Sequence, residues 1–266
     1  MQEIELNEIK AESTPERDEN VIVGRNPVTE ALRSGREIDK LLIARGANQG
    51  STRAIVAKCR ERGILIKEVA PQKPDFMSGG AAHQGVALIV AAHKYCEVSD
   101  IFALAAERGE PPFIIICDEI EDPHNLGAII RTAEACGVHG IIIPKRRSAS
   151  LNTVVAKSSA GALEYMNVAR VANIPSVIEE LKEQGVWVYA ADMDGEPWCH
   201  TDYTGATALV IGSEGRGVGQ LVKKKCDKTV SMPMVGKINS LNASVAAGVI
   251  MQEISKYRYP CGKRDT

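Results

Sequence analysis

The segment from residue 208 to residue 253 constrains the fold most, because two loops rich in glycine and small polar residues each follow a short apolar run there. The first loop, GSEGRG at 212–217, leads into a helical pattern at 218–225. The second, MPMVGKINS at 232–240, follows a brief predicted strand and precedes a helix predicted from Leu241. Strands and helices that alternate at this spacing usually form a parallel sheet, and ligands bind where the loops leave the carboxyl ends of the strands. The two loops therefore predict a pocket at one edge of an α/β sheet.

The same alternation divides the whole chain into segments. A compact α/β unit is predicted over 20–93, a linker with Gly and Pro residues over 94–111, and a larger α/β unit over 112–266. The larger unit opens with a buried strand at 113–117, where the β-branched residues favour a strand over a helix. Residues 1–19 are acidic and lack a sustained apolar period, so they are predicted to form a flexible tail without a catalytic role.

Charge is distributed unevenly between the tail and the rest of the chain. The formal net charge of -2 argues against a generally basic nucleic-acid binder. The acidic tail, however, has a net charge of -5 from seven acidic and two basic residues, which leaves the remaining chain at +3. Basic patches can therefore form on the body of the protein.

Cysteine spacing and the length of the apolar runs indicate which cellular compartment suits the chain. Seven cysteines are scattered without a CxxC pair or a closely spaced histidine, which predicts neither a disulfide framework nor a zinc site and favours a reducing cytoplasm. The apolar runs are strand-sized and no basic region precedes one near the N-terminus, so we expect neither a membrane span nor a secretion signal. The acidic stretch 192–196 lacks the spacing of a calcium loop; we interpret it as a surface loop and expect no metal.

Five polar residues fall at predicted strand-to-helix junctions of the larger unit: Asn125, Arg131, Glu214, Ser240 and Asn242. Each has two interpretations. Asn125, Ser240 and Asn242 can cap the helices that follow them or can contact a ligand. Glu214 is either a turn carboxylate or a partner that orients a basic side chain such as Arg131. Because such junctions converge at one edge of a parallel sheet, we predict that these residues form a catalytic site.

Arginine residues are candidates for contacts with RNA. Arg25 belongs to the smaller unit, whereas Arg146 and Arg147, together with Lys145, form a basic triplet after a predicted strand at 140–143. Arginine offers planar bidentate donors to phosphates and bases. A solvated surface is the alternative for any one of these side chains.

Neither glycine-rich loop is a nucleotide motif. GSEGRG lacks the GxGxxG dinucleotide fingerprint, and no glycine lies five places before Gly236 as a P-loop would require. Hydrolysis of nucleoside triphosphates is therefore unsupported. The glycines instead allow backbone groups to approach a flat ligand closely.

Three motifs, NLGAIIRTAEACGV, LVIGSEGRGV and MPMVGKINSLNASVAAG, occur in this order between residues 125 and 248. They resemble the three signature motifs of the SPOUT superfamily, in its branch of TrmH-type RNA ribose 2′-O-methyltransferases. The smaller unit, from VGRNPVTEAL to HQGVALIV, resembles the substrate-binding domain of that family. The combination is most similar to bacterial enzymes that methylate a guanosine ribose in 23S rRNA of the large ribosomal subunit.

The resemblance implies a fold and a cofactor. The parallel sheet is expected to carry a C-terminal deep trefoil knot, a rare exception to the rule that chains are unknotted. The cofactor is expected to be S-adenosylmethionine, held by backbone groups near Gly212, Met232 and Leu241. A homodimer with the last helix in its interface is also implied. The resemblance assigns the catalytic positions to Arg131, Asn125, Glu214, Ser240 and Asn242.

The expected reaction is attack of a ribose 2′-hydroxyl on the methyl group, which requires alignment and removal of a proton. Arg131 has been proposed as the base in this family, but arginine retains its proton. We favour a role for Arg131 in binding phosphate, with Glu214 and Asn125 fixing its pose, and consider His124 a possible proton acceptor. The alternatives are methylation of tRNA or of another rRNA position, a non-catalytic RNA-binding ribosome-assembly factor, and a small-molecule α/β enzyme.

Overall fold

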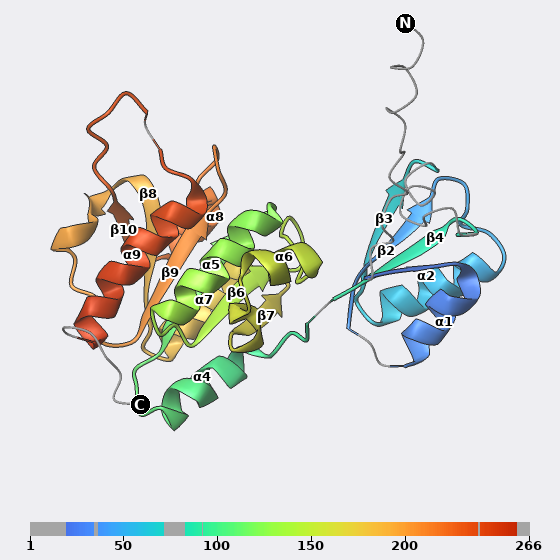
Figure 1. Cartoon of the computed structure of the whole chain (residues 1–266), viewed down its shortest axis with the longest axis horizontal. Helices are drawn as coiled ribbons and strands as arrows, with labels where there is room; N and C mark the ends of the chain where they lie inside the picture. The colour runs from blue at the N-terminus through green and yellow to red at the C-terminus, as the bar shows by residue number, and fades with distance from the viewer. Residues whose placement is uncertain (1–19, 35–36, 72–82, 92, 239, 260–266) are drawn as a thin grey trace, which may run out of the picture. The chain divides into compact units, whose positions relative to one another are not determined.

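The computed structural model contains two units, Met1–Ala91 and Ala92–Thr266 (Figure 1). It describes residues 20–34, 37–71, 83–91, 93–238 and 240–259, and the predicted acidic tail at 1–19 lies outside them. None of the helices formed by the described residues is both long enough and apolar enough to span a bilayer.

The first unit is a four-stranded mixed sheet with two helices. Its elements are β1 (Val21–Val23), α1 (Arg25–Arg33), β2 (Ile38–Ala44), α2 (Ser51–Glu61), β3 (Leu65–Val69) and β4 (Val86–Val90). The strand order is β1-β4-β2-β3, in which only β2 and β3 pair in parallel. Apolar residues of α1 and α2, among them Val28 and Ile55, pack on Leu41 and Leu88 of the sheet.

The second unit is a six-stranded sheet in which every neighbouring pair is parallel. The strand order is β10-β8-β9-β5-β6-β7. Its elements are α4 (Val98–Glu107), β5 (Phe113–Asp118), α5 (Pro123–Ala135), β6 (Gly140–Pro144), α6 (Thr153–Ser158), β7 (Asn167–Val171), α7 (Ile174–Glu183), β8 (Trp187–Pro197), β9 (Thr207–Gly212), α8 (Gln220–Lys225), β10 (Lys228–Ser231) and α9 (Ala243–Arg258). The predicted α/β class with a parallel sheet is confirmed.

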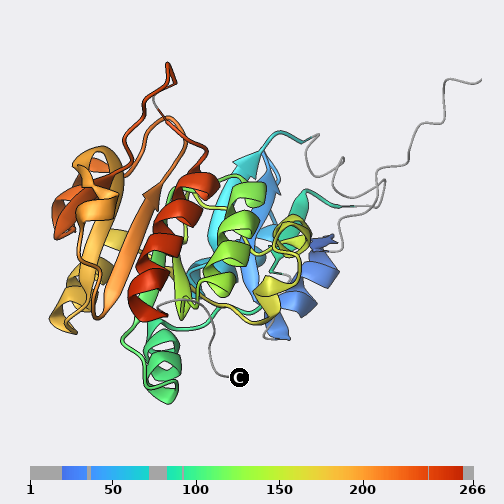
Figure 2. The same cartoon turned by 60° about the vertical axis from the view of Figure 1, so that its left-hand side comes forward.

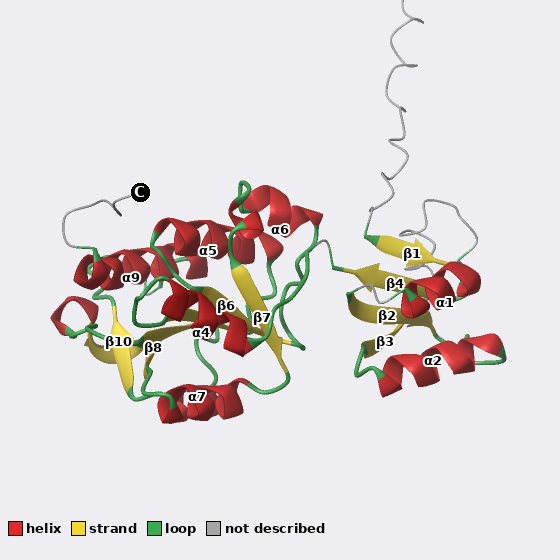
Figure 3. Cartoon of the chain, turned by 90° about the horizontal axis from the view of Figure 1, so that it is seen from below, coloured by secondary structure: helices red, strands yellow, loops and turns green. Residues whose placement is uncertain are grey.

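Helices cover both faces of this sheet (Figure 3). On one face, α5 and α9 lie side by side (Figure 2) and contribute Leu126 and Ile250 to the core. On the other face, Ile178 of α7 and Ile101 of α4 pack against the strands. All six residues of β5 are buried, as expected for a central strand covered on both sides. Each buried Ile or Leu contributes about 1.5–3 kcal/mol to folding.

Helix α4 lies in the segment predicted as a linker, 94–111, yet it packs on the second unit. The Cys96 amide donates to the Val168 carbonyl at 3.0 Å, and Ile101 is fully buried. Ile101 sits so close to Gly140 that a Cβ on that glycine would lie 2.5 Å from it. The glycine that starts β6 therefore creates the space for this helix.

Strand β8 extends through 192–196, the stretch predicted as a surface loop. It pairs in parallel with β10, and the register shifts between Thr229 and Val230. Gly195 allows the two backbones to approach, because a Cβ there would lie 2.5 Å from the Thr229 carbonyl carbon. The prediction of a loop was wrong because this pairing depends on a partner strand more than 30 residues away, which local composition does not reveal.

Candidate active site

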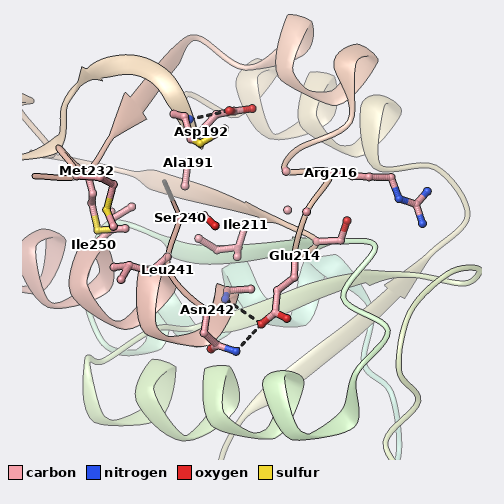
Figure 4. A pocket seen from close by; sticks show the side chains of 18 of the residues that line it. Ala191, Asp192, Ile211, Glu214, Arg216, Met232, Ser240, Leu241, Asn242 and Ile250 are labelled. Atoms are coloured by element: carbon pink, nitrogen blue, oxygen red, sulfur yellow. Dashed lines mark hydrogen bonds between the residues drawn. The ribbon is translucent and has the colours of Figure 1, made fainter. Parts of the chain in front are cut away.

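A cavity of about 680 Å³ opens at the carboxyl edge of the second sheet (Figure 4). Its walls come from the middle of β8, from the ends of β9 and β10 with the loops that follow them, and from the first half of α9. Gly212, Met232 and Leu241, the predicted cofactor residues, lie on its wall together with Ser240. Its volume is within the range of about 300–1,000 Å³ usual for small-molecule sites. The two loops singled out in the sequence therefore meet around one cavity.

The loop after β9 folds tightly back on itself. The Gly217 amide donates to the Ser213 carbonyl at 2.9 Å, and a Cβ on Gly212 would lie only 2.1 Å from the Gly217 carbonyl carbon. Gly215 and Gly217 have φ values of 84° and 65°, a region that disfavours other residues. These glycines fix the path of the loop and so the position of Glu214.

Asn125, Glu214 and Asn242 form a hydrogen-bonded cluster, which we call the amide–carboxylate cluster. The Asn125 Nδ2 group donates to Glu214 Oε1 at 3.1 Å, and Asn242 Nδ2 donates to Asn125 Oδ1 at 2.9 Å. Asn242 Nδ2 also donates to Glu214 Oε1, which accepts the Ala243 amide at 3.4 Å as well. Figure 4 shows Glu214 and Asn242 pointing toward each other at the cavity. One side chain from each of three motifs thus meets at one point.

Asn125 is not the cap of α5. That role belongs to Asp122, whose Oδ1 accepts the His124 amide at 2.9 Å, and Pro123 occupies the first helical position. The helix begins three residues earlier than a cap at Asn125 would place it, so Asn125 lies inside its first turn and bonds across to Glu214. Asn242 both caps a helix and belongs to the amide–carboxylate cluster. Its Oδ1 accepts the Ser244 and Val245 amides at 3.0 and 3.3 Å, which caps the start of α9.

Gly127, two residues after Asn125, explains another part of the first motif. A Cβ at this position would lie 1.9 Å from Ser158 Oγ and 3.0 Å from the Val155 carbonyl oxygen. Glycine therefore lets α6 pack directly on the first turn of α5. This contact fixes the turn that carries Asn125.

Arg131 and Ser240 lie outside the amide–carboxylate cluster. Arg131 is exposed on α5 and does not line the cavity, and it makes no hydrogen bond or ion pair within the described part of the chain. The prediction that Glu214 orients Arg131 was wrong, because Glu214 is bonded to the two asparagines instead. Ser240 is exposed on the cavity wall.

Asp118, at the end of β5, anchors the loop that carries Glu214. Its Oδ2 accepts the Gly219 amide at 2.8 Å. Burial raises the pKa of the Asp118 carboxyl, although the bond from Gly219 acts in the opposite direction. A Cβ at Gly219 would lie 3.0 Å from that oxygen. Asp118 was not among the residues predicted from the sequence, although its position at the end of a buried strand is a signal that could have indicated it.

The predicted RNA-binding residues occupy different settings. Arg25, at the start of α1, donates through Nε to Gln84 Oε1 at 3.2 Å and through Nη1 to Ser51 Oγ at 3.0 Å. Arg146 is exposed on the loop after β6. Arg147 pairs with Glu119 at 2.6 Å. The structure therefore holds Arg25 and Arg147 in place and leaves Arg146 projecting into solvent.

Asp192 and Asp194 are paired with a lysine. Lys223 lies 3.2 Å from Asp192 Oδ2 and also contacts Asp194. No group of three or more His, Cys, Asp or Glu side chains that could hold a metal ion occurs among the described residues. The acidic stretch neutralises part of the basic run 223–225, which the sequence alone does not indicate.

Two family models cover most of the chain. Residues 21–96 match the model described as RNA 2′-O ribose methyltransferase substrate binding. Residues 112–252 match the model of the SpoU rRNA Methylase family. The chain belongs to the SpoU rRNA methylase family. The resemblance seen in the sequence motifs is confirmed.

Proteins similar in sequence to this SpoU family member are named as RNA methyltransferases. A Bacillus subtilis (strain 168) protein named as a TrmH family tRNA/rRNA methyltransferase, YacO, is 48% identical over 91% of this chain and 97% of its own length. A Staphylococcus aureus (strain MSSA476) protein named for the same family is 42% identical over 92% of this chain and 99% of its own. The chain is accordingly an RNA methyltransferase of the SpoU/TrmH family.

Solved SpoU structures resemble this chain over nearly its whole length. The SpoU methyltransferase AviRb from Streptomyces viridochromogenes, in complex with AdoMet, is 26% identical with a TM-score of 0.56, covering 90% of each chain. An AdoMet-bound rRNA methyltransferase from Sinorhizobium meliloti is 25% identical with a TM-score of 0.55, covering 89% of this chain and 87% of its own.

Proposed function

We propose that this SpoU family member transfers a methyl group from S-adenosylmethionine to the 2′-hydroxyl of a guanosine ribose in 23S rRNA. The observation that carries the proposal is the amide–carboxylate cluster, which brings Asn125, Glu214 and Asn242 to the cavity between the two motif loops. Methylation of tRNA is the second candidate, because the relatives are named as tRNA/rRNA methyltransferases.

The cavity fits the proposed cofactor. Ile211, Met232 and Ile250 supply apolar surface, which suits the flat adenine ring of the molecule. The Oγ atom of Ser213 is buried without a hydrogen-bond partner within the described residues, so a polar ligand group could satisfy it. Backbone groups near Gly212, Met232 and Leu241 would hold the cofactor, which supplies an electrophilic methyl group when bound.

The chain's own residues align the RNA ribose and stabilise the charge that develops on its oxygen. Glu214 and the two asparagines form a preorganised polar site, because each is already held by the others. We assign Arg131, which is exposed on α5 outside the cavity wall, to binding a substrate phosphate, a role suited to a side chain that retains its proton. Ser240, exposed on the cavity wall, is positioned to contact substrate or cofactor. His124, exposed beside Asn125, remains our candidate for the proton acceptor.

A homodimer is part of the proposal. Val245 and Val249, one turn apart on α9, are 50% and 37% exposed, and Leu241 precedes them. A second copy would remove this apolar strip from water. We also retain the prediction of a deep trefoil knot, since the chain leaves β10 at the edge of the sheet and returns to pack α9 beside α5.

A reducing cytoplasm suits the cysteines of the described residues, which are all unpaired. Burial raises the pKa of the Cys59, Cys96 and Cys136 thiols to about 11. These thiols are therefore protonated and unreactive near neutral pH.

The test is transfer of labelled methyl from S-adenosylmethionine to rRNA and tRNA from a strain lacking the gene, followed by nuclease mapping. A labelled guanosine ribose in 23S rRNA supports the proposal. Label in tRNA moves the substrate to the second candidate. No label in any RNA, despite cofactor binding by calorimetry, contradicts the proposed reaction and favours a non-catalytic RNA-binding role.

A further inference from the structure

Two arginines from different loops converge on one carboxylate beside the cavity. Arg147 Nη1 lies 2.6 Å from Glu119 Oε1, and Arg216 Nη1 lies 3.4 Å from Glu119 Oε2. We call this group of three side chains the arginine clamp. Arg216 also lies on the cavity wall, two residues after Glu214 of the amide–carboxylate cluster. The clamp is therefore attached to the same loop as the candidate active site.

The sheet order explains why these side chains meet. Glu119 follows β5, Arg147 follows β6 and Arg216 follows β9, and β5 pairs in parallel with both of the other strands. The three loops therefore leave the sheet at the same edge. Glu119 and Arg147 have φ values of 59° and 55°. Such left-handed backbone is unfavourable for residues other than glycine, and it is typical of functional loops.

Two carboxylates near Glu119 have other partners. Asp118 accepts the Gly219 amide, and Asp122 caps α5 through the His124 amide. Glu119 is the residue of this segment that contacts the arginines. Its side chain is only 20% exposed, so most of its surface is covered and its pose is restricted.

The guanidinium groups keep most of their donors available. The side chains of Arg216 and Arg147 are 73% and 66% exposed, and each contacts Glu119 through one nitrogen. A guanidinium has five N–H donors in a planar fork that matches phosphate oxygens. Figure 4 shows the Arg216 side chain extending outward, away from Met232 and Leu241. It therefore faces the approach to the cavity.

We propose that Arg216 and Arg147 bind a backbone phosphate of the substrate RNA next to the nucleotide that enters the cavity, and that Glu119 is a positioning residue for both. The inference rests on the proposed function. A carboxylate that holds two guanidinium groups reduces the conformational entropy that they lose on binding. A single phosphate can then accept from both arginines, which fixes the RNA register at the cavity.

The first experiment is Arg216→Ala, with RNA affinity measured by fluorescence anisotropy at several salt concentrations. The substrate is the RNA fragment mapped as methylated by the wild-type protein. We expect the RNA Kd to rise about 10-fold and the slope of log K against log salt to fall by roughly 0.7–0.9, the value for one phosphate contact. The Kd for S-adenosylmethionine, measured by calorimetry, should stay within about 2-fold, since the Arg216 side chain extends away from Met232 and Leu241, the expected cofactor residues (Figure 4).

Lys224→Ala is the matched control, because it removes one exposed positive charge from the same unit. Lys224 lies on α8 and has no ion-pair partner among the described residues. We expect less than about a 2-fold change in RNA Kd for this variant. Arg216→Lys should restore the salt slope without restoring the full affinity, because lysine lacks the bidentate fork.

Glu119→Gln separates positioning from simple electrostatics. The substitution removes a negative charge next to the RNA path, so electrostatics alone predicts tighter RNA binding. If Glu119 holds the arginines, the RNA Kd instead rises about 3- to 10-fold and kcat/KM for RNA falls, while the salt slope changes little. Tighter binding by Glu119→Gln with unchanged kcat/KM would overturn the positioning role.

The outcomes separate this inference from the proposed function. If the wild-type protein methylates RNA and Arg216→Ala matches it in RNA Kd, salt slope and kcat/KM, the clamp does not bind RNA, whereas the proposed function stands. If Arg216→Ala instead weakens the cofactor Kd and leaves the RNA Kd unchanged, the bound anion is the cofactor carboxylate, and the inference is overturned. If the wild-type protein methylates no RNA, the proposed function itself fails.

Discussion

Two polar networks hold the opposite ends of the second sheet, and they differ in how much hydrogen-bonding capacity remains. At the carboxyl end, Glu214 meets Asn125 and Asn242 beside the cavity, and its Oε2 atom has no protein partner within the described residues. At the amino end, His139 accepts the Phe113 amide at Nδ1 and contacts Glu110 at Nε2, at 2.9 and 3.0 Å. The Glu214 network therefore keeps an acceptor atom for a ligand, whereas both ring nitrogens of His139 already contact protein groups.

Both networks also secure α9, one at each end. Asn242 caps the start of the helix. At its other end, Arg258 donates to the carbonyls of Pro111, Pro112 and Gly205, and Tyr259 donates to Glu110 at 2.7 Å. The bonds at the C-terminal end of α9 therefore stabilise the helix. Its N-terminal end lies at the cavity, where we expect the reaction. Polar residues at a sheet edge indicate a functional site only when some of their hydrogen-bond donors or acceptors face a cavity.

The largest expected effect comes from removing the shared carboxylate of the first network. Glu214→Ala should lower kcat/KM for methyl transfer about 1,000-fold, which corresponds to roughly 4 kcal/mol, because both asparagines lose their common acceptor. Glu214→Gln keeps an acceptor oxygen and should lose less. Single-turnover methyl transfer to mapped rRNA measures both.

Glu179→Ala is the control for Glu214→Ala. Glu179 is an exposed carboxylate on α7 that pairs with Lys225 of α8. It does not line the cavity, and its loss should leave kcat/KM within about 2-fold. If Glu214→Ala retained more than a tenth of wild-type activity, the cluster would be structural like the network at the opposite end, and the comparison would fail.

The second expected effect concerns stability. Arg258→Ala should lower the free energy of unfolding by about 3 kcal/mol, because three carbonyl groups lose a charged donor, and its guanidinium leaves the Phe113 ring, 4.9 Å away. The change corresponds to a decrease in Tm of roughly 6–12 °C. Thermal unfolding measures it, and Lys256→Ala, which removes an exposed lysine paired with Glu253 on the same helix, should change Tm by less than about 2 °C.

The cofactor Kd of Arg258→Ala, measured well below its Tm, should remain that of the wild-type protein. A large increase in this Kd would show that the amino-end network also shapes the cavity, which would contradict the separation of the two ends.

The third effect is a pH dependence of stability. Burial lowers the pKa of His139 to about 4, although Glu110 acts in the opposite direction. The unfolded state then binds a proton below a pKa of about 6.5 that the folded state does not bind, so stability is present above that pH and is lost as the pH falls toward 4. We expect His139 to account for a loss of about 2 kcal/mol between pH 7.5 and pH 5 in urea unfolding.

His139→Asn provides the comparison for this pH effect. Asparagine can still accept the Phe113 amide but does not titrate, so the variant's stability should change less over the same pH range. Identical profiles of stability against pH for the wild-type protein and His139→Asn would mean that folding does not keep the His139 imidazole neutral.

The sequence was sufficient to predict the network that faces the cavity. Glu214 lies within a glycine-rich loop and Asn242 follows a polar loop, both at strand ends, so their convergence follows from the parallel sheet. Of the two interpretations of Asn125, the helix cap was wrong, because Asp122 and Pro123 are better suited to start a helix. Arg131 was predicted beside Glu214, but helical geometry directs it elsewhere on α5.

The network at the amino end could not be predicted in the same way. His139 and Glu110 lie in turns whose local sequence has no distinctive motif, and Arg258 lies near the C-terminus, where a basic residue is usual at the end of a helix. Their contacts depend on which strands are neighbours, and the sequence pattern does not determine strand order. The pairing of Arg216 with Glu119 was missed for the same reason.

The smallest effect is expected for Tyr259→Phe, which removes one hydrogen bond to Glu110 while keeping the ring. The loss should be about 1–2 kcal/mol of unfolding free energy, because the acceptor is a carboxylate. Glu110 also contacts His139, so the effects of Tyr259→Phe and His139→Asn should not add, and a double-mutant cycle by urea unfolding measures their coupling. A coupling energy of at least about 0.5 kcal/mol is expected for one closed network. Additive effects would mean that Tyr259 and His139 act independently, and the amino end would then resemble a set of separate contacts rather than the counterpart of the cluster at the cavity.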